Sequence, residues 1–229
     1  MHQTRGAAHL KEKKVKSKPM RANTPARHTL RNSLILGLVA IVLVALAVYA
    51  LTRPPAASLG AARLASDPAL GPASAKVTII EYGDFGCTTC RGWEKAGVLK
   101  QVVATYGDRV HFVWRDFPVI TVLSPKAAEA GQCAFDQGKF WEYHDLLYAK
   151  APALQVSDLK NYAAQLGLDT ARFDQCLDSG QDKAKVDQSL NEGHQYGFPG
   201  TPSFLINNQK FVGPLSFAQI KAVVDPLLQ

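Results

Sequence analysis

Two cysteines, Cys87 and Cys90, lie where a predicted strand passes directly into a predicted helix. Residues 76–82 are rich in β-branched side chains, which is typical of a buried strand. Residues 91–106 carry apolar side chains at helical spacing, namely Trp93, Val98, Leu99, Val102 and Val103. The pattern predicts one helix over residues 91–106, with Cys87 at or just before its first turn. It favours an α/β domain with its chemistry at this junction.

The predicted helix start has a chemical consequence for Cys87. The first N–H groups of a helix have no partner within it, and the aligned peptide dipoles leave partial positive charge there. This charge favours a thiolate and lowers the thiol pKa by roughly one unit. We therefore expect Cys87 to be an acidic, accessible nucleophile and Cys90 to form a disulfide with it. Thr88 and Thr89 between them carry hydroxyls that can donate hydrogen bonds but no charge.

The positive charge of the chain is concentrated at its N-terminus. Residues 1–33 contain nine lysines and arginines and one glutamate, a net charge of +8, whereas the whole chain has +7. The remaining residues therefore sum to −1. A nucleic-acid-binding body would carry the positive charge itself, so nucleic acid is excluded as a partner. We interpret residues 1–33 as a basic cytoplasmic tail.

An uncharged apolar run follows the tail at residues 34–51. As a helix it would span about 27 Å, close to the ~30 Å hydrocarbon core of a bilayer. We predict a single transmembrane anchor over residues 34–52, with the N-terminus in the cytoplasm and the remaining chain extracytoplasmic or periplasmic. The alternative is a signal peptide with a weak cleavage site at Val48-Tyr49-Ala50. Either way, the body reaches a compartment where disulfides persist.

Proline and alanine dominate the stretch after the anchor. Residues 53–74 contain four prolines among alanine, serine and glycine, which predicts a semi-extended linker: Pro54, Pro55, Pro68 and Pro72. The domain proper is expected to cover residues 75–229.

The two ends of this domain have an α/β pattern. The side chains of residues 108–117 alternate with a period of two, which predicts a second strand. Together with the first strand and the helix between them, it predicts a parallel βαβ unit with a right-handed crossover. Residues 203–213 predict a hairpin around Asn207-Asn208, because asparagine tolerates the positive φ of a tight turn. Ser216 is expected to cap a final helix that ends near Pro226.

Between these parts, residues 119–197 are predicted to form a helical insertion. Helical faces run through residues 125–150 with a break at Gly138. A further helix is expected with Ser157 as its cap, another from Thr170, and then a polar helix.

These motifs together resemble the thioredoxin-fold thiol–disulfide oxidoreductases of the DsbA-like type, especially the membrane-anchored or exported bacterial members. The likeness covers about residues 69–229 and rests on the Cys-x-x-Cys, the Thr201-Pro202 pair before the hairpin, and the insertion. It implies a thioredoxin-like fold in which Thr201-Pro202 is a cis-proline pair facing the cysteines. It also implies that Glu81 is a buried acid that takes the proton from Cys90. The alternatives are a trans proline that begins a strand and a glutamate that faces water.

The resemblance implies disulfide exchange with unfolded exported proteins, most simply as an oxidase, and a membrane redox partner that reoxidises or reduces the pair. No cofactor is expected, because two cysteines carry two electrons themselves. A reductase or isomerase of the same fold and a non-catalytic peptide-binding holdase or assembly factor are the alternatives. Many relatives have proline and then histidine or tyrosine between the cysteines, whereas this chain has Thr88-Thr89. The neutral pair predicts a milder oxidant.

Two further cysteines, Cys133 and Cys176, lie on separate predicted helices of the insertion. An exported domain with such a pair predicts a structural disulfide, which some relatives carry, and two buried free thiols are the alternative. The chain-entropy relation predicts that this bridge stabilises the fold by about 4 kcal/mol, against roughly 2 kcal/mol for the ring closed by Cys87 and Cys90. We expect no metal site, because zinc sites usually need four ligands in close pairs. Cu(I) transfer through Cys87 and Cys90 stays open.

Overall fold

The computed structural model describes Gly37, residues 39–45 and residues 66–229. Gly37 and residues 39–45 are helical, and the side chains of residues 39–45 are exposed. Within these described ranges, no helix combines the length and the apolar character needed to cross a membrane. The predicted tail, most of the predicted anchor and the first part of the predicted linker lie outside the described residues.

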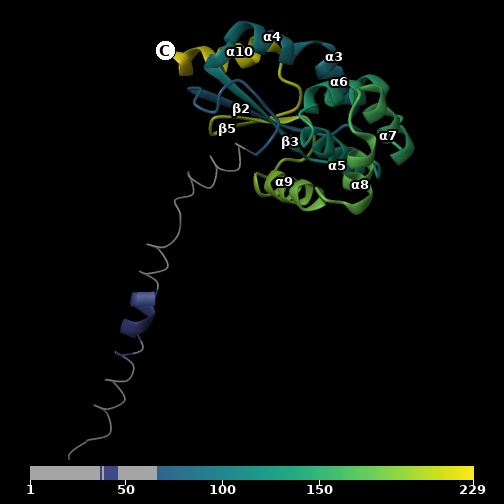
Figure 1. The fold of residues 1–229 in the computed structure, drawn as a ribbon. Helices are drawn as coiled ribbons and strands as arrows, with labels where there is room; N and C mark the ends of the chain where they lie inside the picture. Colours follow the sequence, from purple (N-terminus) through teal and green to yellow (C-terminus); the bar gives the residue numbers. More distant parts are fainter. Residues whose placement is uncertain (1–36, 38, 46–65) are drawn as a thin grey trace, which may run out of the picture. The chain divides into compact units, whose positions relative to one another are not determined.

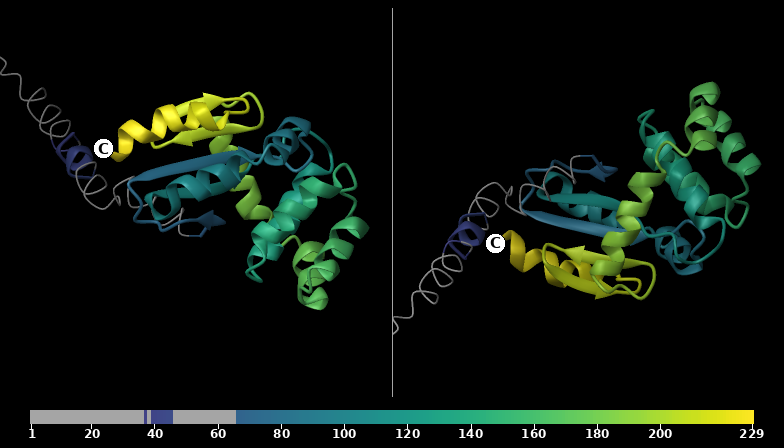
Figure 2. Two further views of the ribbon diagram at one scale, coloured as in Figure 1. Left: turned by 90° about the horizontal axis from the view of Figure 1, so that it is seen from above. Right: turned by 90° about the horizontal axis from the view of Figure 1, so that it is seen from below.

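A five-stranded mixed sheet forms the centre of the domain (Figures 1 and 2). Its spatial order is β1-β3-β2-β4-β5, with β2 and β3 parallel and the other neighbours antiparallel. The strands are β1 (Ala69–Leu70), β2 (Val77–Gly83), β3 (Val110–Asp116), β4 (Ser203–Ile206) and β5 (Gln209–Val212). The predicted βαβ unit and the predicted C-terminal hairpin are both confirmed, and Asn207 has the expected positive φ, at 50°.

Helices cover both faces of this sheet, which explains why every residue of β3 is buried. On one face, apolar side chains of β2 and β3 pack against α3 (Thr88–Lys95), α4 (Val98–Tyr106) and α10 (Phe217–Leu228). On the other face lies α9 (Lys183–Gln195), below the sheet in Figure 1. The short helix η1 (Gly107–Arg109) leads from α4 into β3. This enclosure matches the strongly apolar character of the strands.

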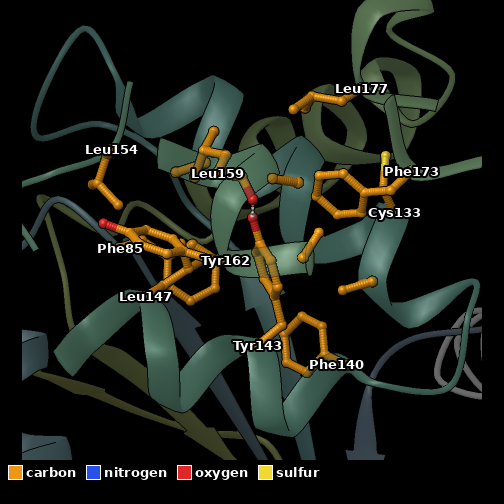
Figure 3. Packing of buried hydrophobic residues seen from close by; sticks show 14 of the residues in the cluster. Phe85, Cys133, Phe140, Tyr143, Leu147, Leu154, Leu159, Tyr162, Phe173 and Leu177 are labelled. Carbon is orange, nitrogen blue, oxygen red and sulfur yellow. Dashed lines mark hydrogen bonds between the residues drawn. The ribbon is translucent and has the colours of Figure 1, made fainter. Parts of the chain in front are cut away.

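The helical insertion forms a lobe beside the sheet (Figure 2). It contains α5 (Ser124–Phe135), α6 (Phe140–Lys150), α7 (Val156–Gln165) and α8 (Thr170–Ser179). Figure 3 shows its core, in which side chains from all four helices meet and the Tyr143 hydroxyl donates to the Leu159 carbonyl at 2.9 Å. The predicted break between the first two helices is confirmed at Gly138, whose φ is 71°.

Two local predictions about helices were wrong. The helix expected over residues 91–106 is two helices, because Gly97 adopts a left-handed φ of 69° between α3 and α4. The cap of α7 is Gln155, which forms a reciprocal capping box with Asp158, and not Ser157. Ser216 caps α10 as expected, and the helix ends at Leu228, two residues after Pro226.

The sheet begins earlier in the chain than expected. Strand β1 lies within residues 53–74, which were predicted to be a linker, and pairs antiparallel with β3. The backbone N–H of Trp114 donates to the Pro68 carbonyl at 2.9 Å, and Arg115 forms a 2.8 Å ion pair with Asp67. These contacts fix residues 67–70 along the edge of the sheet.

Candidate active site

Cys87 lies at the start of α3, directly after the turn that leaves β2. It is the N-cap residue: its sulfur accepts the backbone N–H of Cys90 at 3.3 Å. The thiol also donates to the Thr201 carbonyl at 3.3 Å. Cys87 and Cys90 are both free. The predicted placement of the pair at a helix N-terminus is therefore confirmed, and Thr201 lies beside it.

The sulfur of Cys87 is less accessible than the sequence indicated. Cys87 is only 5% exposed and Cys90 only 1% exposed. Both belong to the apolar cluster of the insertion, next to Phe85 and Trp114, whose rings stack with their centroids 5.0 Å apart. Thr88, the next residue along the chain, is exposed.

The surroundings of Cys87 lower its pKa to about 5. The largest cause is the hydrogen bond from the Cys90 side chain, and burial opposes it. The Thr201 side chain adds to the lowering. The backbone N–H groups of Cys90 and Thr89 act in the same direction. Thr89 thus contributes through its backbone, whereas its hydroxyl was the group expected to act.

The reduced protein should accordingly contain one thiol, that of Cys87, which ionises at acidic pH. We expect the ultraviolet absorbance of the thiolate and the rate of alkylation of Cys87 to rise with a midpoint near pH 5. Because the folded-state pKa is depressed, the thiolate stabilises the reduced fold fully above the ordinary thiol pKa and loses this effect as pH falls through about 5. Cys87→Ser is the control for the absorbance signal. A midpoint near the ordinary thiol value would contradict this assignment.

Glu81 and Cys90 form the buried side of the site. Glu81 is 2% exposed and lies in mid-sheet, in register with Trp114 on β3 and Phe204 on β4, so the alternative of a water-facing glutamate is wrong. Burial, followed by the charges of Glu94 and Cys87, raises its pKa well above the usual range. Burial also raises the pKa of Cys90, assisted by Cys87 and Glu81. Glu81 thus acts on the second thiol, and burial favours the neutral form of both groups.

The Thr201-Pro202 peptide bond is cis, as the resemblance implied, and Pro202 directly precedes β4. The loop is fixed on both sides: the Ser203 hydroxyl donates to the Gly200 carbonyl at 2.7 Å, and the Gly213 N–H donates to the Pro202 carbonyl at 2.9 Å. Residues far apart in the sequence therefore meet at Cys87. A second cis bond, Ala151-Pro152, was not predicted from the sequence.

Cys133 and Cys176 are joined in a disulfide that connects α5 to α8, with their Cα atoms 5.9 Å apart. They lie in the insertion and are not part of the Cys87 site. Among the described residues, one group has metal-ligand spacing, formed by these two sulfurs and Asp182. Both sulfurs are bonded to each other and are therefore not available as thiolate ligands.

Two polar groups near the cysteines were not singled out from the sequence. Asp84, three residues before Cys87, is buried, and the buried Tyr148 hydroxyl donates to the Asp84 carbonyl at 3.3 Å. An aspartate at a strand end is a known turn former, because its side chain can accept from backbone N–H groups two residues on. That signal was present in Asp84-Phe85-Gly86. The position of Tyr148 depends on the docking of α6 and had no local signal.

A central strand that ends in a helix-capping cysteine pair beside a cis-proline loop defines a thiol–disulfide oxidoreductase of the thioredoxin fold. The sequence matches the family described as thioredoxin over residues 64–226, and the chain belongs to this family as a DsbA-like member.

Solved structures and curated sequences support this membership. A thioredoxin-like oxidoreductase from Silicibacter pomeroyi DSS-3 has 27% identity and a TM-score of 0.64, covering 70% of this chain and 91% of its own. BdbD from Bacillus subtilis (oxidised) shares the fold, with 20% identity, a TM-score of 0.66, and coverage of 72% and 94%. Among curated proteins, the Na(+)/H(+) antiporter NhaA 3 of Salinispora tropica is 36% identical over 160 residues, 69% of this chain and 24% of the antiporter. The chain thus spans about a quarter of the length of such relatives.

Proposed function

We propose that this protein exchanges disulfides with exported proteins through Cys87 and Cys90, acting as an oxidase. The observation that carries the proposal is the contrast between the two sulfurs. The pKa of Cys87 is lowered to about 5 by hydrogen bonds at the start of α3, while burial raises the pKa of Cys90. A sulfur that is stable as a thiolate is both a good attacking group and a good leaving group near neutral pH.

In the oxidase direction, a client thiolate attacks the Cys87 sulfur of the oxidised pair. The Cys87–Cys90 bond breaks, a client–Cys87 disulfide forms, and Cys90 leaves and takes a proton, for which Glu81 is the buried donor. A second client thiolate then attacks the client sulfur of this mixed disulfide. Cys87 departs as a thiolate, the client gains a disulfide, and the protein retains two electrons. In the reverse direction, Glu81 accepts the proton of Cys90 as that thiol attacks.

The acidity of Cys87 also supports the oxidase direction over the reductase and isomerase alternatives. Stabilising the thiolate stabilises the reduced protein, which makes the disulfide more oxidising. A pKa of about 5 falls between about 7 for thioredoxin and about 3.5 for a strong oxidant. This intermediate value supports the milder oxidant that the neutral Thr88-Thr89 pair predicts.

The proposed clients are unfolded chains that lie in extended form beside Thr201-Pro202. A membrane redox partner would reoxidise the pair after each turnover. The basic residues 1–33 and the apolar residues 34–51 support an anchored protein with its catalytic domain outside the cytoplasm. The Cys133–Cys176 disulfide supports the same compartment.

The test is to mix the oxidised protein with a reduced, unfolded substrate protein and count the disulfides formed. We expect one substrate disulfide per oxidised pair, together with loss of the Cys87–Cys90 bond. The equilibrium constant with glutathione shows whether the protein acts as an oxidase or as a reductase. A potential as reducing as that of thioredoxin would refute the oxidase assignment, and binding of the substrate without any change in its thiol count would favour the holdase alternative.

A further inference from the structure

Asp84 is a buried carboxyl group whose oxygens are met by backbone amides; burial raises its pKa, and these hydrogen bonds oppose the rise. It follows β2 directly, precedes Cys87 by three residues and is only 2% exposed. Its Oδ1 accepts the N–H of Gly86 at 2.7 Å, and its Oδ2 accepts the N–H of Ile120 at 2.8 Å. No lysine or arginine within residues 66–229 forms an ion pair with it. Because burying a carboxylate is unfavourable unless it is hydrogen-bonded, both amides must be held in place for Asp84 to stay buried.

The backbone of Asp84 makes further connections. Its carbonyl accepts the N–H of Cys87 at 3.0 Å, which closes the turn into α3, and also the hydroxyl of Tyr148 on α6 at 3.3 Å. One residue therefore links the cysteine turn, the loop after β3 and a helix of the insertion.

The turn and the loop fit closely at Gly86. A Cβ atom at this position would lie 2.6 Å from Ser124 Oγ and 2.8 Å from Thr121 Oγ1, which are shorter than van der Waals separations. The Ser124 side chain also lies beside the Asp84 carboxyl group, where it lowers the pKa of that group, and the Ser124 hydroxyl accepts the Thr121 N–H at 3.1 Å. No atom fits between Gly86 and these side chains, so the turn that leads into Cys87 packs directly against the loop.

We propose that Asp84 is a positioning residue for the disulfide exchange proposed above: through Gly86 and the loop after β3, it holds Cys87 against the first amides of α3 and so sets the redox potential of the pair. The inference rests on the proposed function of Cys87 and Cys90. Stabilisation of an anion by a helix N-terminus falls off within the first turn. A small displacement of the sulfur from the Cys90 N–H, now 3.3 Å away, therefore destabilises the thiolate.

The direction in which the Cys87 pKa changes distinguishes a positioning role of Asp84 from a direct electrostatic effect of its charge. If Asp84 acted only as a nearby negative charge, neutralising it would stabilise the thiolate and lower the pKa of Cys87. If Asp84 acts by holding the turn, neutralising it raises that pKa. Asp84→Asn tests this at nearly constant volume, because the amide nitrogen would face one of the two N–H donors and lose that bond.

The experiment measures the Cys87 pKa from the thiolate absorbance and the equilibrium with glutathione in full-length Asp84→Asn. We expect the pKa to rise by about one unit and the glutathione equilibrium to move about tenfold toward the oxidised protein. A pKa that is unchanged or lower in the folded variant would overturn the proposal. If the wild-type protein fails to exchange with glutathione, the proposed function fails, but the pKa comparison still tests Asp84.

Asp116→Asn is the matched control. Asp116 is also 2% exposed, and its carboxylate accepts from Trp114 Nε1 at 2.8 Å and from Gln132 Nε2 at 2.5 Å. This variant should lose stability and keep the Cys87 pKa; an equal pKa change in it would mean general loosening and would overturn the assignment. If Asp84→Asn does not fold, Ser124→Ala removes one contact to Asp84 and should shift the glutathione equilibrium about threefold in the same direction. An unchanged glutathione equilibrium in Ser124→Ala would also overturn the proposal.

Discussion

Replacing Cys90 with serine is expected to leave the protein covalently attached to its clients. Cys87 would still attack a client disulfide, since its N-cap position and its contact with Thr201 do not require a second sulfur. The mixed disulfide would then persist, because the hydroxyl of serine does not attack a disulfide. The largest contribution to the acidity of Cys87 would change, because it comes from the Cys90 side chain. We therefore expect attack to slow while the product of attack accumulates.

This expectation is measured by incubating Cys90→Ser with a protein that contains a disulfide and separating the products without reductant. A band at the combined mass that disappears on reduction is the expected product. Cys87→Ser is the matched control, and it should give no adduct, because Cys90 is only 1% exposed and its pKa is raised by burial. Adducts of equal yield in both variants would contradict the assignment of Cys87 as the nucleophile.

The double variant Cys133→Ala/Cys176→Ala is expected to lose about 4 kcal/mol of unfolding free energy by the chain-entropy relation, for a bridge between residues 43 apart. The bridge joins α5 to α8 and lies in the core shown in Figure 3, so the loss should fall on the helical insertion. Denaturant unfolding monitored by circular dichroism gives the value. The active-site chemistry should persist under native conditions, because the hydrogen bonds at Cys87 come from Cys90 and Thr201 and not from this bridge.

Cys87→Ser provides the comparison for this second measurement, since it removes a sulfur and keeps the insertion bridge. The double variant should have a clearly lower unfolding midpoint than the wild-type protein, whereas Cys87→Ser should lose only the stabilisation that its thiolate gives the reduced fold. Equal midpoints for the double variant and the wild-type protein would show that the bridge contributes nothing to the stability of the fold.

The features that the sequence predicted well depend on residues close together in the chain. The cysteine pair, the Asn207 turn, the Gly138 break and the Ser216 cap are set by local backbone preferences, and the structure has all four. The cis bond before Pro202 came from the resemblance to a family and not from local preferences.

The features that the sequence did not predict depend on packing between distant segments. Strand β1 has only two residues, too few for a periodic pattern, and exists because the edge of β3 is available to it. The low exposure of Cys87 results from the insertion, whose cluster contains Phe85 and Trp114. Gln155 is used as a cap because Asp158 completes a reciprocal pair, although Ser157 has the better intrinsic preference.

The ion pairs of Arg115 join parts of the domain that are far apart in the sequence. Arg115 on β3 binds Asp67 at 2.8 Å and Glu192 of α9 at 3.2 Å, and it is only 6% exposed. Removing one partner of such an enclosed pair costs about 3–5 kcal/mol. These ion pairs are separate from the hydrogen bonds at Cys87, so their loss should lower the stability of the domain without removing a contact of the reactive sulfur.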